Sequence, residues 1–300
     1  MGDFIDELRL LRNNYHLGSY PQVIDEALSS RDASVDRRVL AYRALLASNK
    51  LDRVISELQS SPDAELQAVR LHALHQQAIG TRNSGAKAKV VGDILALVGT
   101  GNNAHSSTVQ AITALILYAE ERYTEALQGV LPIPRNLECV AIAVQCYLKL
   151  DRPEFAQREV EKLRTWADDA TLAQLAEAWA KCAVGGRQNI QDSEYIFEEL
   201  ASSKSATGRI ISGRAICKMQ AGEFAEAERI LVEGLSRCPN DPDLIANLVS
   251  CAAATGKSPE IINQYFGKLK ELAPQHPLVE EYTLKESLFQ RSAQRFALAK

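Results

Sequence analysis

Apolar residues recur along the chain at helical intervals, and short polar breaks separate the apolar stretches. Leu66 and Val69 stand three residues apart, as do Leu71 and Leu74, and Ala, Leu, Glu and Gln are frequent in such stretches. Pro and Gly gather in breaks such as SSPD, GTGNN, VGGRQN and CPNDPD, which leave stretches of about 10 to 16 residues between them. No long alternating run rich in Val, Ile and Thr appears. The pattern predicts an all-α protein with about sixteen or seventeen helices of similar length.

The helices also repeat at a fixed interval. In the stretch KMQAGEFAEAERILVEGLSRCPND, Gly222 recurs 34 residues later as Gly256, and Ala227 has counterparts at Ala126 and Ala156. Small residues let two antiparallel helices approach closely, and Pro239 ends the second helix. A unit of this length and pattern is typical of tetratricopeptide repeats. We therefore predict a right-handed α-solenoid of about eight helix pairs plus a C-terminal helix, forming a single domain over residues 1–300.

Two segments depart from the repeat. Residues 76–108 keep the helical rhythm but lose the small-residue pattern, so we expect a degenerate repeat with a longer loop; the GTG within it lacks the Lys-Ser/Thr of a phosphate-binding loop. Residues 277–298 form one long apolar-striped helix, which is expected to cap the array. The residues of its stripe are Leu278, Tyr282, Leu284, Leu288 and Phe289.

Charge and composition exclude several classes of function. The chain has 34 Lys and Arg against 38 Asp and Glu, and it has no basic run, so nucleic acid is a poor candidate for its partner. The N-terminus lacks the apolar core of a secretory signal. The most apolar run, residues 111–119, has about half the length that a bilayer requires. We expect a soluble protein whose contact with membranes is peripheral.

Residues that could carry chemistry are few. The six cysteines form no CxxC pair, and Cys146, Cys217 and Cys251 stand at the same place in their repeats, which indicates buried packing residues. His72 and His75 have a spacing that could hold a metal ion, but no third ligand lies nearby. No nucleophile elbow, HExxH or glycine-rich phosphate cradle is present. The sequence predicts no enzyme, no cofactor and no metal site.

A repeat scaffold of this kind acts by binding a partner in its concave groove. One place that lines such a groove lies three residues before the Gly222 position, and none of its occupants is charged. They are Tyr15, Leu46, Tyr118, Leu148, Cys182, Met219 and Ala253. An apolar groove suits a hydrophobic element of another protein, although any one of these residues can instead pack between repeats. The predicted partner-binding residues are Tyr15, Leu46, Tyr118, Leu148, Trp179 and Met219.

Several segments resemble a more specific family. Residues 60–73 (SSPDAELQAVRLHA), 137–163, 168–200, 245–257 and 276–291, with YHLGSY at 15–20, are similar to segments of the epsilon subunit of coatomer, the coat of COPI vesicles. The resemblance spans about residues 15–295 and is weakest at 76–108. It implies a non-catalytic tetratricopeptide scaffold that pairs with the C-terminal region of the alpha subunit and encircles it. It also implies a cytoplasmic protein, peripheral on Golgi membranes and COPI vesicles, that acts in retrograde Golgi-to-ER and intra-Golgi transport.

Two alternatives stay open at this point. A generic tetratricopeptide adaptor or co-chaperone would bind an acidic C-terminal peptide, which needs Lys, Arg and Asn side chains in the groove. An enzyme would need a convergent polar cluster in a pocket.

Overall fold

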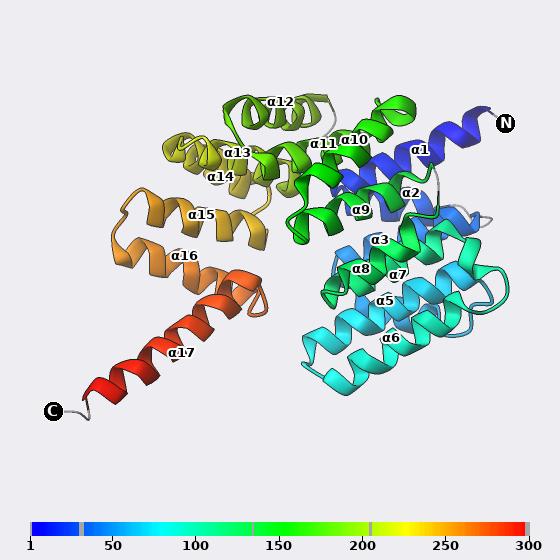
Figure 1. Ribbon diagram of the computed structural model, residues 1–300, viewed down its shortest axis with the longest axis horizontal. Coiled ribbons are helices and arrows are strands. Elements are labelled where there is room, and N and C mark those ends of the chain that lie inside the picture. Colours follow the sequence, from blue (N-terminus) through cyan, green and yellow to red (C-terminus); the bar gives the residue numbers. More distant parts are fainter. Residues whose placement is uncertain (1, 30–32, 134, 204–205, 298–300) are drawn as a thin grey trace. The chain divides into compact units, whose positions relative to one another are not determined.

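The computed structural model describes residues 2–29, 33–133, 135–203 and 206–297. Over these residues every regular element is a helix, as predicted, and the α-helices form eight consecutive pairs followed by a single C-terminal helix (Figure 1). The pairs are α1 (Gly2–Leu17) and α2 (Tyr20–Leu28), α3 (Val35–Ala47) and α4 (Leu51–Glu57), α5 (Ala64–Gly80) and α6 (Ser84–Val98), α7 (Ser107–Ala119) and α8 (Tyr123–Val130), α9 (Leu137–Lys149) and α10 (Pro153–Ala167), α11 (Thr171–Val184) and α12 (Arg187–Ser203), α13 (Gly208–Gln220) and α14 (Phe224–Arg237), and α15 (Pro242–Ala254) and α16 (Pro259–Leu272). The last helix is α17 (Pro277–Ala297).

The chain divides into two compact units. Unit 1 comprises residues 1–196 and unit 2 comprises residues 197–300, with the boundary inside α12. The single domain predicted for residues 1–300 stays a prediction.

A left-handed backbone residue marks the turn inside every pair. Four turns use glycine, as at Gly222 (φ 80°), whereas the others use Asn49, Arg82, Glu121 and Asp151 with φ between 52° and 59°. At the Gly222 turn the N–H of Glu223 donates to the carbonyl of Lys218 at 2.9 Å, which closes the end of the helix. Because four of the turns use a residue other than glycine, a glycine marks the turn in only half of the pairs.

Close packing inside the pairs follows from the small residues. Ala215 and Ala227 have no exposed surface, and both belong to the core of unit 2 together with Leu231. Between consecutive pairs, a methyl group added at Gly213 on α13 would lie 2.4 Å from Cε1 of Phe197 on α12, so that position has room only for hydrogen. The prediction that Cys146, Cys217 and Cys251 are buried is confirmed; all three are free cysteines.

The region that lost the repeat pattern has an enlarged connection. The left-handed residues Arg82 and Glu121 are 121 − 82 = 39 residues apart, against 256 − 222 = 34 for the regular repeat at Gly222 and Gly256. The extra length lies between α6 and α7, where the short 3-10 helix Asn103–His105 is inserted. The GTG sequence follows the end of α6: Gly99 is its C-cap, donating its N–H to the carbonyl of Leu95.

The long C-terminal helix is present, but most of its apolar stripe is exposed. Val279 is buried against Ile245 and Leu269, and the rings of Tyr282 and Phe266 lie 4.6 Å apart. Only the first turns of α17 therefore cover the preceding pair. The role of α17 as a cap stays a prediction.

Candidate partner-binding surface in the ring of first helices

The first helices of the pairs in unit 1 form a closed ring. Each packs against the first helix of the next pair, in the order α1, α3, α5, α7, α9 and α11, and α11 in turn contacts α1. In α3 every residue from Val39 to Leu46 is buried, and in α7 every residue from Val109 to Ala114 is buried. A helix that is buried all round needs neighbours on all sides. The inner faces of this ring are therefore largely covered by the chain itself.

An ion pair crosses the centre of the ring. Arg43 lies on α3 and Glu138 on α9, which are opposite members of the six helices, and Nη1 of Arg43 donates to the two carboxylate oxygens at 3.0 and 2.8 Å. Nε2 of His16 on α1 lies 3.6 Å from the same carboxylate. The guanidinium carbon of Arg43 lies 4.8 Å from the ring centre of Tyr15, within reach of a cation–π contact. The centre of the ring therefore holds a buried, mutually neutralising charge pair.

The pKa values of this pair follow from burial and mutual attraction. The Arg43 side chain is 7% exposed and that of Glu138 is 20% exposed. Burial raises the pKa of Glu138, but the charge of Arg43, followed by that of His16, outweighs it, so the pKa lies below its ordinary value. Burial opposes the charge of Arg43, yet Glu138 holds the pKa of Arg43 above its ordinary value. Both groups stay charged at neutral pH.

His72 and His75, which have the spacing of metal ligands, contact different groups. Burial, then the charge of Arg43 and the nearby His75, lowers the pKa of His72 to about 3, so this ring is neutral. Nε2 of His75 lies 2.8 Å from Oε1 of Glu120, which Lys87 also contacts at 2.9 Å. Burial raises the pKa of Glu120, but the hydrogen bonds from Lys87 and His75 outweigh burial, so the pKa lies below its ordinary value. Across the described residues no group of three or more His, Cys, Asp or Glu side chains could hold a metal ion.

Five of the six predicted binding residues share one structural place. Tyr15, Leu46, Tyr118, Leu148 and Met219 lie in the last turn of a first helix, and the carbonyl of each accepts the N–H of the left-handed turn residue three positions later. The place identified from the repeat spacing is therefore the C-terminal turn of the first helix. Trp179 lies further inside α11.

Their surroundings differ. Leu148 and Trp179 pack against the same cluster of buried residues on α9, α10 and α11. Tyr118 is half-buried beside Tyr123, with ring centres 5.3 Å apart, and burial, followed by Tyr123, raises the pKa of Tyr118 to about 12. Leu46 is 4% exposed and belongs to the core of unit 1. Its contact with a partner stays a prediction, as do the contacts of the other five.

Tyr15 and Met219 have other packing partners. Tyr15 is half-buried and its ring packs against Tyr20, 5.8 Å away. Met219 belongs to unit 2, where it packs against the core formed by α13, α14 and α15. Within unit 1 the structure therefore brings Leu148 and Trp179 onto one cluster.

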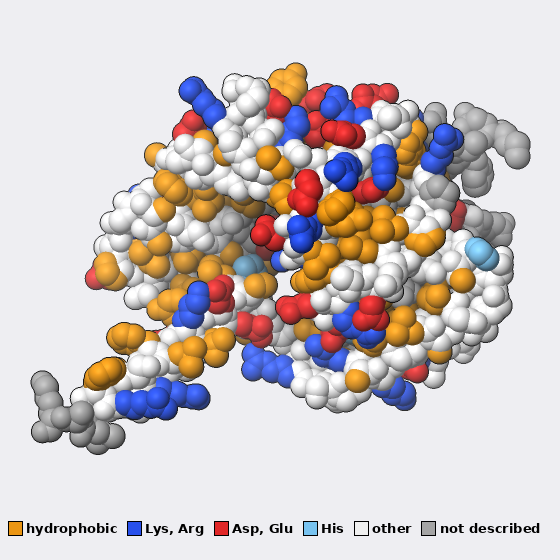
Figure 2. All heavy atoms as spheres, viewed as in Figure 1, with side chains coloured by type: hydrophobic (Ala, Val, Ile, Leu, Met, Phe, Trp, Pro, Cys, Tyr) orange, Lys and Arg blue, Asp and Glu red, His pale blue; other side chains and the backbone are white. Residues whose placement is uncertain are grey.

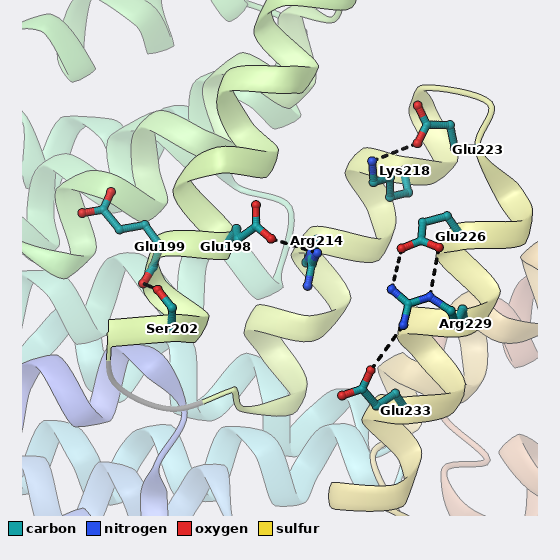
Figure 3. Close-up of polar contacts among 9 residues, drawn as sticks. All are labelled: Glu198, Glu199, Ser202, Arg214, Lys218, Glu223, Glu226, Arg229 and Glu233. Atoms are coloured by element: carbon teal, nitrogen blue, oxygen red, sulfur yellow. Dashed lines mark hydrogen bonds and ion pairs between the residues drawn. The ribbon is translucent and has the colours of Figure 1, made fainter.

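Cations on α13 and α14 of unit 2 are paired with carboxylates of the same chain. Figure 3 shows Lys218 bound to Glu223, Arg214 bound to Glu198, and Arg229 held between Glu226 and Glu233. Such exposed pairs contribute little to stability. In these pairs, however, the cations that could bind the carboxylates of an acidic peptide are already bound to carboxylates of this chain.

Comparisons with known proteins agree on one family. The family model described as coatomer epsilon subunit matches residues 4–297. The chain is similar to coatomer subunit epsilon-2 of Arabidopsis thaliana, with 35% identity over 99% of each chain, and to coatomer subunit epsilon of Dictyostelium discoideum, with 27% identity over 95% of this chain and 97% of that protein.

Solved structures support the fold. A tetratricopeptide repeat protein from Parabacteroides merdae matches 88% of this chain and 96% of its own, with a TM-score of 0.57 and 17% identity. One chain in the structure of the APC/C hetero-tetramer Cut9–Hcn1 is also similar: the match covers 91% of this chain and 54% of that chain, with a TM-score of 0.61 and 11% identity. At these identities the likeness concerns the fold alone. No helix in the described part of the chain combines the length and the apolar character needed to span a bilayer.

Proposed function

Because the chain belongs to the coatomer epsilon subunit family, and so to the COPI coatomer, we propose that it is a non-catalytic subunit that binds the C-terminal region of the alpha subunit. In this role it stabilises alpha within the coat during retrograde Golgi-to-ER and intra-Golgi transport. It reaches Golgi membranes and COPI vesicles peripherally, through the coat.

The observation that carries the proposal is the half-buried apolar surface at Leu148 and Trp179. Both side chains pack on one cluster of unit 1 while each keeps part of its surface in water. Tyr118 offers a third surface of the same kind on α7. Large side chains that are already held by packing lose little entropy when a partner covers them, so they suit anchor positions in an interface.

The ion pair in the ring favours an apolar contact over a charged one. Arg43 and Glu138 neutralise each other, and the cations near Met219 are paired as well. Binding that depends on burial should respond weakly to salt, whereas binding through surface charge should weaken as salt screens it. The same pairing disfavours a generic adaptor for acidic peptides.

Titration calorimetry with the alpha C-terminal region tests the proposal at low and high salt. We expect Tyr118→Asp and Leu148→Asp to weaken binding about tenfold or more, because each places an unpaired carboxylate in a desolvated contact. The matched control is Trp166→Asp, since Trp166 is exposed on α10, the second helix of its pair. Unchanged affinity in both test variants would show that the partner docks elsewhere. No binding by the wild-type chain would overturn the assignment of the partner.

A further inference from the structure

Helix α17 exposes an apolar face that no other element of the chain covers in the described residues. Its exposed large apolar side chains are Tyr282, Leu284, Leu288, Phe289 and Phe296, a larger set than on any other described helix. Phe289 and Phe296 are 73% and 80% exposed. Figure 2 shows apolar side chains along this helix, and Figure 1 shows α17 continuing past α16. Large exposed apolar side chains gathered on one helix mark an interaction site.

Four of these five residues, all except Leu284, fall in two rows of seven-residue spacing that lie about 100° apart around the helix. Tyr282, Phe289 and Phe296 form an aromatic row, because positions seven apart lie within about 20° of each other around a helix. The row beside it consists of Glu281, Leu288 and Arg295, also seven apart. This second row runs from an acid through an apolar residue to a base.

Those two rows are self-complementary when a second copy of the helix runs in the opposite direction. In that arrangement Phe289 meets Phe289 of the second copy, and Tyr282 meets Phe296 of the second copy. Glu281 then lies two residues, about 3 Å along the helix axis, from the level of Arg295 of the second copy, and the two Leu288 side chains lie between the ion pairs. In a parallel two-fold pair the second rows of the two helices would lie on opposite sides of the contact, so Glu281 and Arg295 of the two copies would not meet. We propose that α17 joins two copies of this chain as an antiparallel, two-fold symmetric helix pair.

The remaining contacts of α17 are compatible with this pairing. Tyr282 keeps about half of its surface exposed while its ring contacts Phe266, so Phe296 of the second copy can pack beside both rings. Glu281 already pairs with Lys285 one turn later, on the exposed surface. A carboxylate can accept from two cations, so this pair does not prevent a contact with Arg295 of the second copy.

The area available indicates a weak and reversible association. Large side chains bury about 150–250 Å² each, and the four in the two rows, at one-half to four-fifths exposure, offer roughly 400–500 Å² per copy. The two copies together would bury about 800–1,000 Å², which is the size of a weak, transient interface. Such a contact forms where the local concentration of the chain is high.

Sedimentation equilibrium of the purified chain over about 1–300 μM tests the proposal directly. We expect a reversible change from one to two chain masses. Phe289→Asp should abolish the dimer, because it places two carboxylates at the symmetry axis. The matched control is Gln290→Asp, which introduces the same charge on an exposed position about 100° further around the helix.

A charge swap separates this geometry from nonspecific association. Glu281→Arg and Arg295→Glu should each weaken dimerisation about tenfold, because each turns two attractive contacts into repulsive ones. The double variant Glu281→Arg/Arg295→Glu should restore the wild-type affinity, since the same pairs form with their signs exchanged. Circular dichroism confirms that each variant keeps its helices. A chain that stays monomeric over the whole range, or a double variant no tighter than the single ones, would overturn the proposal.

Discussion

Glu138→Gln tests whether the ion pair across the ring stabilises unit 1. The substitution keeps the size of the side chain but removes the charge that compensates Arg43, whose side chain is 7% exposed. Removing one partner of a buried ion pair costs about 3–5 kcal/mol, because the other charge is left without compensation. Glu138 itself keeps a fifth of its surface in water. We therefore expect a loss of about 3 kcal/mol, at the low end of that range.

Tryptophan fluorescence during urea unfolding isolates the unit concerned. The chain has two tryptophans, Trp166 and Trp179, and both belong to unit 1. The double variant Arg43→Met/Glu138→Leu removes both charges, and we expect it to recover most of the loss, since apolar replacement of a buried pair is often close to neutral. A loss below about 1 kcal/mol for Glu138→Gln would refute the reasoning. So would a double variant less stable than the single one.

Three further predictions concern histidine and glycine positions. The pKa of His72 is lowered to about 3 when folded against about 6.5 when unfolded, so stability present above pH 6.5 is lost as the pH falls towards 3. His72→Leu should therefore reduce the difference between the urea midpoints measured at pH 7 and pH 5. The reduction should be smaller than for a fully buried histidine, because His72 is half-buried. Gly213→Ala should destabilise unit 2 by about 1–3 kcal/mol through its clash with Phe197, followed by circular dichroism. Gly222→Ala should cost about 1 kcal/mol in the same assay, because its φ is 80°.

The fold could be predicted because one local rule is repeated. Small residues such as Ala227 recur where two helices approach, and this spacing gave both the helix pairs and their number. The turns were harder to locate where no glycine marks them. At Glu121 and Asn49 the left-handed conformation is imposed by the hydrogen bonds that close the helix, as at Glu121 N–H to the carbonyl of Tyr118. Glu121 gives no sequence signal for this conformation, whereas Asn49 is of a residue type that adopts it more readily than most.

The ion pair at the centre of the ring could not be predicted from the sequence, because only one groove-lining position in each repeat was considered there. Arg43 lies three residues before Leu46 and is therefore on a neighbouring part of the same helix. Its partner Glu138 is 138 − 43 = 95 residues away, and no local spacing links the two. A signal was present, since Arg43 is a lone charge between the apolar runs VLAY and ALLA. A buried cation of this kind requires an anion, but only the three-dimensional arrangement identifies it.

The contact between α1 and α11 has a consequence for how the chain is made. A repeat array ordinarily folds with help from its nearest neighbours alone. Here α1 ends at Leu17 and α11 begins at Thr171, so 171 − 17 = 154 residues separate the two sides of the seam. At about 5–20 residues per second, synthesis takes roughly 8–30 s to cover that distance. Within the ring of unit 1, we expect the first pair of helices, although it is made first, to complete its packing last and to depend most on chaperones until α11 has emerged from the ribosome.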